Sequence, residues 1–183
     1  MSYLRAFAPW IAFAIIPSGY WEWAALFALA VSLVGLISQV RARRPADAQI
    51  IEIGSAVYFA AIAGLAFADP KTALHPYVPC MASGALGLIA CVSLAIGKPF
   101  TLGIARQSVP REVWDYPMFL RVNVIITSVW AASFVTGCVA LGLLAHSPAA
   151  ARSAVQVAAF VIPLVFTIRY AARARERGRA AVS

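Results

Sequence analysis

Long apolar stretches alternate with short polar segments along the whole chain. The six apolar stretches lie at about 6–18, 22–40, 50–68, 77–97, 118–145 and 153–171. A helix of about 20 apolar residues covers the hydrocarbon core of a bilayer. The pattern therefore predicts an all-α protein, a polytopic transmembrane helix bundle that forms one domain over 1–183 and ends in a basic cytoplasmic tail at 172–183.

The first stretch allows three interpretations, because Pro9 and Pro17 keep it short. A tight membrane hairpin with 22–40 gives six spans. Fusion with the next stretch, or re-entry into the same leaflet, gives five. A signal-peptide core with Arg5 as its basic region is the third interpretation. The hairpin is the preferred one, since the stretch runs almost directly into a second long span.

The positive charges lie in alternate gaps between the stretches. With the amino terminus inside, only Lys71 and Arg152 of the 15 Lys and Arg residues fall in outer segments. Six spans therefore satisfy the positive-inside rule with both termini cytoplasmic. Five spans would move Arg5 alone, so the charge rule does not exclude them.

The low charge content supports a membrane environment. Only 12% of the residues are charged, against about 25% in soluble domains. The net charge of +8 comes from arginines that flank apolar stretches and do not form one basic face. This distribution predicts membrane lipids as partners, with possible contacts to other membrane proteins or self-association, and argues against nucleic acid.

Two polar positions near the inner ends of spans carry the candidate chemistry. Glu52 begins the third stretch, and we expect it to pair with Arg106 or Arg121, which the topology places in the same leaflet. The alternative is a solvated charge at a helix end. Asn123 begins a face that continues through Thr127, Trp130 and Phe134 at helical spacing. The candidate inner-leaflet polar cluster is Glu52, Arg106, Arg121 and Asn123.

The polar segment 98–117 is a candidate interaction connector, with Lys98, Phe100 and Trp114 as its prominent residues. A short interfacial helix near 101–108 would direct Phe100, Leu102 and Ile104 toward lipid or protein and leave Arg106 for headgroups. Pro110 would end it. The connector either binds lipid headgroups or a partner, or simply follows the membrane surface.

Rows of small residues at four-residue spacing predict close helix packing. Three candidate seams run through Gly64, Gly87 and Ala132; their full rows are Ala56, Ala60, Gly64 and Ala68; Ser83, Gly87, Cys91 and Ala95; and Ser128, Ala132, Thr136 and Ala140. Pro163 should also kink the last helix and free a backbone carbonyl near Ala159.

Motifs for catalysis are absent from the sequence. It contains no phosphate-binding loop, no His-Glu-x-x-His and no Gly-x-Ser-x-Gly, so no catalytic residue, cofactor or metal is predicted. Cys80, Cys91 and Cys138 lie inside apolar stretches without paired spacing, and we interpret them as small packing residues. No ionisable residue lies near the centre of a span, which argues against a proton-driven carrier.

The part of the chain between 97 and 130 resembles a known group of proteins. Its features are Gly97-Lys98-Pro99-Phe100-Thr101-Leu102, Ala105-Arg106, Val109-Pro110, Trp114, Asn123 and Trp130. This pattern resembles a family of small bacterial polytopic membrane proteins and is distantly similar to the intracellular septation protein A family of inner-membrane proteins. The sequence departs from that family in longer polar insertions between Arg106 and Asn123.

The resemblance implies a multi-pass protein of the bacterial inner membrane. It also implies a non-enzymatic role in envelope maintenance or membrane-complex assembly, and it supplies no site residues. A transporter or channel for a small or lipophilic solute is the first alternative. A lipid-acting membrane enzyme built on the inner-leaflet polar cluster is the second.

Overall fold

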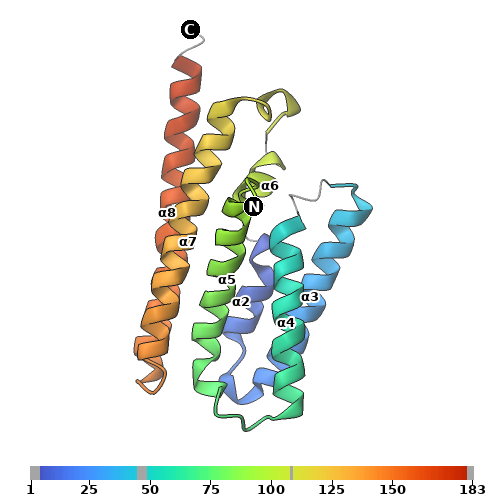
Figure 1. The fold of residues 1–183 in the computed structure, drawn as a ribbon, viewed down its shortest axis with the longest axis vertical. Helices are drawn as coiled ribbons and strands as arrows, with labels where there is room; N and C mark the ends of the chain where they lie inside the picture. The colour runs from blue at the N-terminus through green and yellow to red at the C-terminus, as the bar shows by residue number, and fades with distance from the viewer. Residues whose placement is uncertain (1–4, 45–48, 108, 181–183) are drawn as a thin grey trace. The chain divides into compact units, whose positions relative to one another are not determined.

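The computed structural model describes residues 5–44, 49–107 and 109–180. The helices are α2 (Ala8–Ile15), α3 (Trp21–Arg41), α4 (Ile50–Ala68), α5 (Val78–Ala95), α6 (Phe100–Arg106), α7 (Pro117–Leu143) and α8 (Ala149–Ala180). Single 3₁₀ turns lie at Ser18–Tyr20, His75–Tyr77 and Arg111–Val113. The predicted all-α class is confirmed for this part of the chain (Figure 1).

Among the described residues, five helices are long and apolar enough to cross a membrane: α3, α4, α5, α7 and α8. This indicates a multi-pass membrane protein. The third predicted stretch, 50–68, coincides with α4. The first stretch forms only α2, whose eight residues span about 12 Å, so the helix lengths fit the five-span alternative.

The last helix is longer than the sequence pattern indicates. The predicted span 153–171 lies inside α8, which has 32 residues and therefore extends about 48 Å. That length exceeds a hydrocarbon core of about 30 Å. Part of the predicted tail, up to Ala180, thus continues α8, while 181–183 lie outside the described residues.

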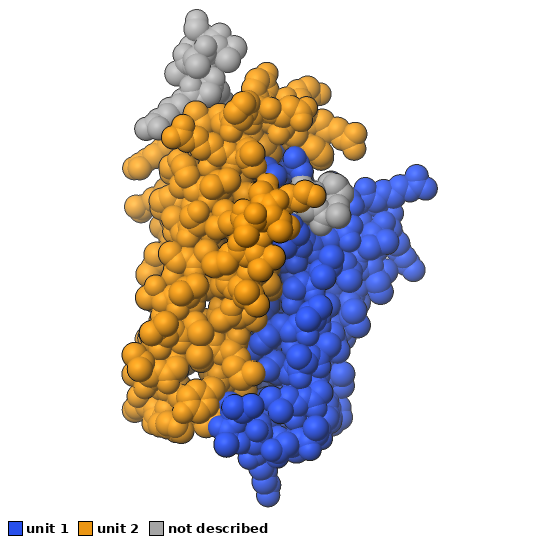
Figure 2. Space-filling model, viewed as in Figure 1, with its two compact units in different colours: residues 1–75, 102–109 blue, residues 76–101, 110–183 orange. Residues whose placement is uncertain are grey.

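The contacts divide the chain into two compact units, where the sequence suggested one domain (Figure 2). Unit 1 comprises Met1–His75 and Leu102–Val109, and unit 2 comprises Pro76–Thr101 and Pro110–Ser183. Unit 1 therefore contains α2, α3 and α4, and unit 2 contains α5, α7 and α8. The short helix α6 begins in unit 2 and continues into unit 1.

In unit 1, α3 packs along α4 and also contacts α2. Ala24, Ala28 and Ser32 form a buried row on α3, and their small size allows close approach of the neighbouring helix. Trp10 of α2 stacks on Tyr58 of α4 with a centroid separation of 5.0 Å. An aromatic contact of this kind stabilises α2, which is too short to form a stable helix alone.

In unit 2, α7 contacts both α5 and α8 along its length. Its buried face includes Asn123, Thr127, Trp130 and Phe134, which confirms the face predicted from their spacing. Gly137 lies on the same face, and a Cβ atom added there would be 3.0 Å from the Cβ of Ala159 on α8. The glycine is therefore needed for the close contact between α7 and α8.

The turn after α5 sets the direction of α6. Gly97 has a φ of 69°, a left-handed conformation that glycine adopts without steric cost. The backbone N–H of Lys98 then donates to the Ser93 carbonyl at 2.9 Å, which completes a Schellman cap. The Ser93 hydroxyl accepts from the N–H of Phe100 at 3.1 Å, so the start of α6 is held against the end of α5.

Candidate functional site

The predicted inner-leaflet residues belong to different units. Glu52 and Arg106 lie in unit 1, whereas Arg121 and Asn123 lie in unit 2. A single cluster of all four therefore stays a prediction. Each unit nevertheless holds a buried polar group of its own, and these two groups are the candidate sites.

The site in unit 1 is centred on the carboxyl group of Glu52. Glu52 lies in the first turn of α4 and is 8% exposed. Its Oε1 accepts a hydrogen bond from Nε2 of Gln39 on α3 at 3.0 Å, and Gln39 is also buried. Its Oε2 is buried without a hydrogen-bond partner among the described residues. A buried acceptor without a donor is costly, so Oε2 is a position at which an incoming donor or cation would be stabilised.

The hydrogen-bond partner of the Glu52 carboxyl is Gln39 of α3, and the expected ion pair with Arg106 stays a prediction. The sequence gives no sign of the role of Gln39, because an amide inside an apolar stretch carries no charge. The pairing of Glu52 with Arg121 stays a prediction.

One turn deeper in unit 1, a second polar bond joins α2 to α4. The indole N–H of Trp10 donates to Oγ of Ser55 at 2.7 Å, and Ser55 itself donates to the carbonyl of Ile51 at 2.7 Å. Gln39–Glu52 and Trp10–Ser55 therefore connect all three helices of the unit. Their position on facing helices could not be read from spacing along one helix.

The site in unit 2 lies between α6 and α7. The hydroxyl of Thr101 contacts Oγ1 of Thr127 at 2.7 Å and donates to the backbone carbonyl of Asn123 at 3.1 Å. Nδ2 of Asn123 donates to the carbonyl of Phe119, four residues earlier on the same helix, at 2.9 Å. This bond of the Asn123 side chain therefore lies within α7 and does not join two helices. Its Oδ1 is buried without a hydrogen-bond partner among the described residues.

Polar bonds also join α7 to α8 around Pro163. The indole N–H of Trp130 donates to Oγ1 of Thr167 at 2.9 Å, and Thr167 donates to the carbonyl of Pro163 at 2.7 Å. Oγ of Ser133 donates to the carbonyl of Ala159 at 2.9 Å. Pro163 has no N–H to give to that carbonyl, so the predicted free acceptor is real and is satisfied by the neighbouring helix.

The connector carries its prominent residues in different environments. Phe100, Leu102 and Ile104 are buried, so the short predicted helix exists as α6 and directs its apolar residues into protein. Lys98 is exposed. The guanidinium of Arg111 lies 5.6 Å from the ring centroid of Trp114, a cation–π contact. Lys98 and Arg111 therefore belong to the accessible polar surface of the connector.

Only one of the three candidate seams packs within its unit. Gly87 is buried on α5, and a Cβ there would be 3.2 Å from Cγ2 of Val135. Gly64 and Ala132 are exposed, and a Cβ added at Gly64 would meet nothing within 4 Å. The seams predicted through Gly64 and Ala132 are thus wrong as contacts inside their units, because alternative faces of α4 and α7 are buried.

Two of the three cysteines lie close together in unit 2. Sγ of Cys80 on α5 lies 3.4 Å from Sγ of Cys138 on α7, while Cys91 is exposed. The two positions are 58 residues apart, so a search for short paired spacing could not find them.

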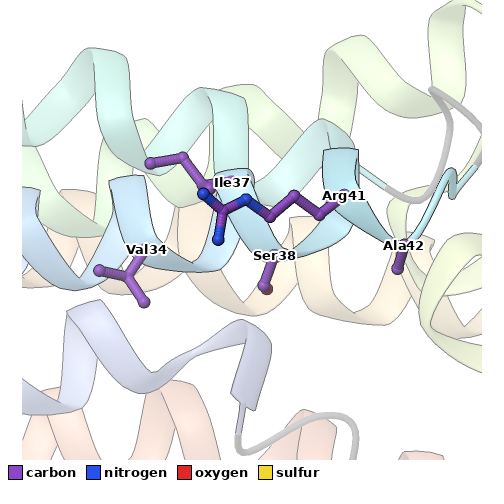
Figure 3. Close-up of a pocket in the computed structure, with 5 residues that line it drawn as sticks. All are labelled: Val34, Ile37, Ser38, Arg41 and Ala42. Carbon is purple, nitrogen blue, oxygen red and sulfur yellow. The ribbon is translucent and has the colours of Figure 1, made fainter.

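A shallow groove follows the last two turns of α3. Its lining is Val34, Ile37, Ser38, Arg41 and Ala42 (Figure 3). Figure 3 shows the Arg41 side chain lying back along the helix toward Ile37. The Ser38 hydroxyl donates to the Gly35 carbonyl at 2.7 Å. The groove therefore combines apolar side chains with one cation on an exposed face of α3.

No protein-family model, curated protein or solved structure matches the chain. The resemblance to the septation family therefore stays a prediction.

Proposed function

We propose that the protein is a non-enzymatic, multi-pass component of the bacterial inner membrane that assembles with other membrane proteins in envelope maintenance. The observation that carries this proposal is the pair of exposed small-residue rows on α4 and α7. Gly64 and Ala132 leave room for another helix to approach closely, and such rows are where membrane helices associate.

The hydrogen bonds of the buried polar side chains support a structural role. Gln39–Glu52 and Trp10–Ser55 join helices in unit 1. Trp130–Thr167 and Ser133–Ala159 join helices in unit 2. Side chains used in this way hold helices together. The exposed groove on α3 is also consistent with a bundle whose contacts are made on its outside.

The proposed orientation has both termini and the basic segments on the cytoplasmic side. In unit 1, α4 begins soon after the segment with Arg41, Arg43 and Arg44, and Trp10 of α2 donates to Ser55 near the start of α4. This contact is consistent with Arg5 lying at the same end of the unit as those arginines. Retention of arginine-rich segments on the cytoplasmic side then supports this orientation.

The proposal is tested by filling the exposed rows. Gly64→Leu and Ala132→Leu add side chains where the units leave open space, so folding should be retained while close approach of a partner is blocked. Ala30→Leu is the matched control, since Ala30 is exposed on α3 outside both rows. The readout is the size of the complexes that a mild detergent extracts from bacterial membranes, together with their subunit composition.

We expect the wild type and Ala30→Leu to migrate in the same larger complexes. At least one of the two row variants should lose them without loss of protein level. Migration of the wild type as a free chain, or complexes unaffected by both row variants, would contradict the proposal.

A second candidate function, transport of a small solute, is favoured by one observation. Oε2 of Glu52 is a buried acceptor without a hydrogen-bond partner among the described residues, and ionisable groups within membrane segments often mark transport pathways. The purified protein in liposomes would be compared with Glu52→Gln for flux of protons and monovalent cations. Flux above that of empty liposomes that falls in Glu52→Gln would favour transport over assembly.

A further inference from the structure

Sulfur and glycine face each other twice where the start of α5 packs against the end of α7. Cys80 lies in the first turn of α5, and Cys138 lies near the end of α7. A Cβ added at Gly84 of α5 would be 3.2 Å from Sγ of Cys138, and one added at Gly142 of α7 would be 3.4 Å from Sγ of Cys80. Each thiol thus lies against a glycine of the opposite helix. A side chain at either glycine position would take up the space that the sulfur now occupies.

We propose that Cys80 and Cys138 form a reversible disulfide that links α5 to α7. Their sulfurs are 3.4 Å apart, and a disulfide bond is about 2.0 Å long. The required approach of about 1.4 Å is within the range of side-chain rotation and a small shift of helices that meet through glycine. Cys91 lies on the same helix as Cys80 but is exposed.

The chemistry is a two-electron thiol–disulfide exchange with an oxidant that is itself a disulfide. One cysteine loses its proton, and its thiolate attacks a sulfur of the oxidant to give a mixed disulfide and one oxidant thiolate. The second cysteine, as its thiolate, then attacks the mixed disulfide at the first cysteine's sulfur. The Cys80–Cys138 bond forms, and the oxidant leaves as two reduced thiols that carry the two protons.

The compartment in which this would occur follows from the proposed orientation, on which this step rests. Tyr77, just before α5, contacts His146, just after α7, at 3.4 Å, so both cysteines are near one end of unit 2. Lys98 follows the opposite end of α5. If Lys98 is cytoplasmic, the cysteine pair lies toward the outer face, where disulfides form and persist.

The test counts free thiols in the full-length protein purified in detergent. Reduced protein is treated with oxidised glutathione and separately with copper phenanthroline, then denatured and labelled with a maleimide polymer that adds visible mass per thiol. We expect three additions before oxidation and one afterwards. Cys91→Ser should give none after oxidation, and Cys80→Ser or Cys138→Ser should retain two in the monomeric chain. Wild-type protein that keeps three thiols with both oxidants would overturn the proposal.

Stability provides a second readout that does not depend on labelling. Closing a loop of this length should raise the midpoint of thermal unfolding by about 5 °C or more in the oxidised wild type and in oxidised Cys91→Ser. Reduction should reverse the shift, and Cys138→Ser should show none. An oxidised protein that melts at the same temperature as the reduced one would contradict a bond between packed helices.

The oxidation state of the cysteines in cells tests the disulfide and the proposed orientation separately. Thiols are trapped in whole bacteria by acid and alkylation before lysis, and the same count is made. One free thiol supports both inferences. Three free thiols in cells, with a disulfide that forms readily in purified protein, would support the pair and contradict the orientation.

Discussion

At the scale of single residues, Pro163 and Ser133 show how a backbone hydrogen bond lost within one helix is replaced by a hydrogen bond from a neighbouring helix. Proline removes a donor from α8 and leaves the Ala159 carbonyl open. In a bilayer no water is at hand to satisfy it, so a neighbouring side chain must do so. Ser133 of α7 does this at 2.9 Å, which makes the serine and the proline parts of one arrangement.

This pairing predicts a dependence between two substitutions. Ser133→Ala should lower the free energy of unfolding by roughly 0.6–1.7 kcal/mol, the range of interhelical hydrogen bonds in membranes. In a Pro163→Ala background the new N–H of residue 163 can donate to Ala159. The same serine substitution should then cost less than about 0.5 kcal/mol. Unfolding in SDS–detergent mixtures, followed by circular dichroism, measures the double-mutant cycle. An equal cost of Ser133→Ala in both backgrounds would mean that the bond does not serve the opened carbonyl.

Single residues also show which features of the candidate sites can be predicted from the sequence. The open carbonyl at Ala159 was predictable, because it depends only on Pro163 and the geometry of one helix. The face of Asn123, Thr127 and Trp130 was predictable for the same reason. The Gln39–Glu52 bond was not, since it joins two helices whose rotation about their axes is set by packing.

At the scale of helices, the choice of buried face decides which small residues matter. α4 buries Ile51, Ser55 and Phe59, and the alanine and glycine row through Gly64 is left outside. An alanine-rich helix offers several rows of small residues, and their spacing is the same on each. The bulky aromatic residues of α2 and α4 determine which face of α4 is buried. This choice depends on packing between helices, so it cannot be predicted from residue spacing along one helix.

Two glycines with opposite surroundings give a matched prediction. A Cβ at Gly137 would lie 3.0 Å from Cβ of Ala159, whereas one at Gly64 would meet nothing within 4 Å. Gly137→Ala should therefore lower the free energy of unfolding by roughly 1 kcal/mol, because overpacking outweighs the gain in helix propensity. Gly64→Ala should leave it unchanged or raise it by up to about 1 kcal/mol.

The two variants can be compared by thermal unfolding in the same detergent. A stabilising Gly137→Ala would show that α7 and α8 do not approach as closely as the structure places them. A destabilising Gly64→Ala would instead indicate that the exposed row is already packed in the isolated protein.

At the scale of the whole molecule, the first 20 residues decide the number of crossings. The all-α class and the positions of the long helices followed from hydrophobic length, which is a strong signal in a membrane sequence. The short first stretch gave no such signal. α2 is followed by extended residues at Ile16 and Pro17, so the chain from Arg5 to Pro17 covers roughly 20 Å, less than a full core.

A hydrophobic stretch of that length can still cross where the bilayer thins or where charged ends reach the interface. The first segment follows α4, since Trp10 donates to Ser55 at 2.7 Å and Phe13 contacts Phe59 one turn further on. Beyond the other end of α4, His75 contacts the Ser18 carbonyl at 3.2 Å. The first segment therefore runs between the two ends of the unit. We expect six passages of the chain, five of them by long helices, because this number would reconcile the short α2 with the proposed cytoplasmic amino terminus.

This topology is tested by single cysteines in a variant whose three native cysteines are serine. Cysteine at position 71 should react with a membrane-impermeant maleimide in intact cells. Cysteines at positions 5 and 44 should react only after lysis. Arg5 and Arg44, the native residues at these two positions, are exposed. Protection of a cysteine at position 5 would therefore come from the membrane and not from burial in protein. Labelling of position 5 together with position 71, while position 44 stays protected, would show that α2 does not traverse and that five passages are correct.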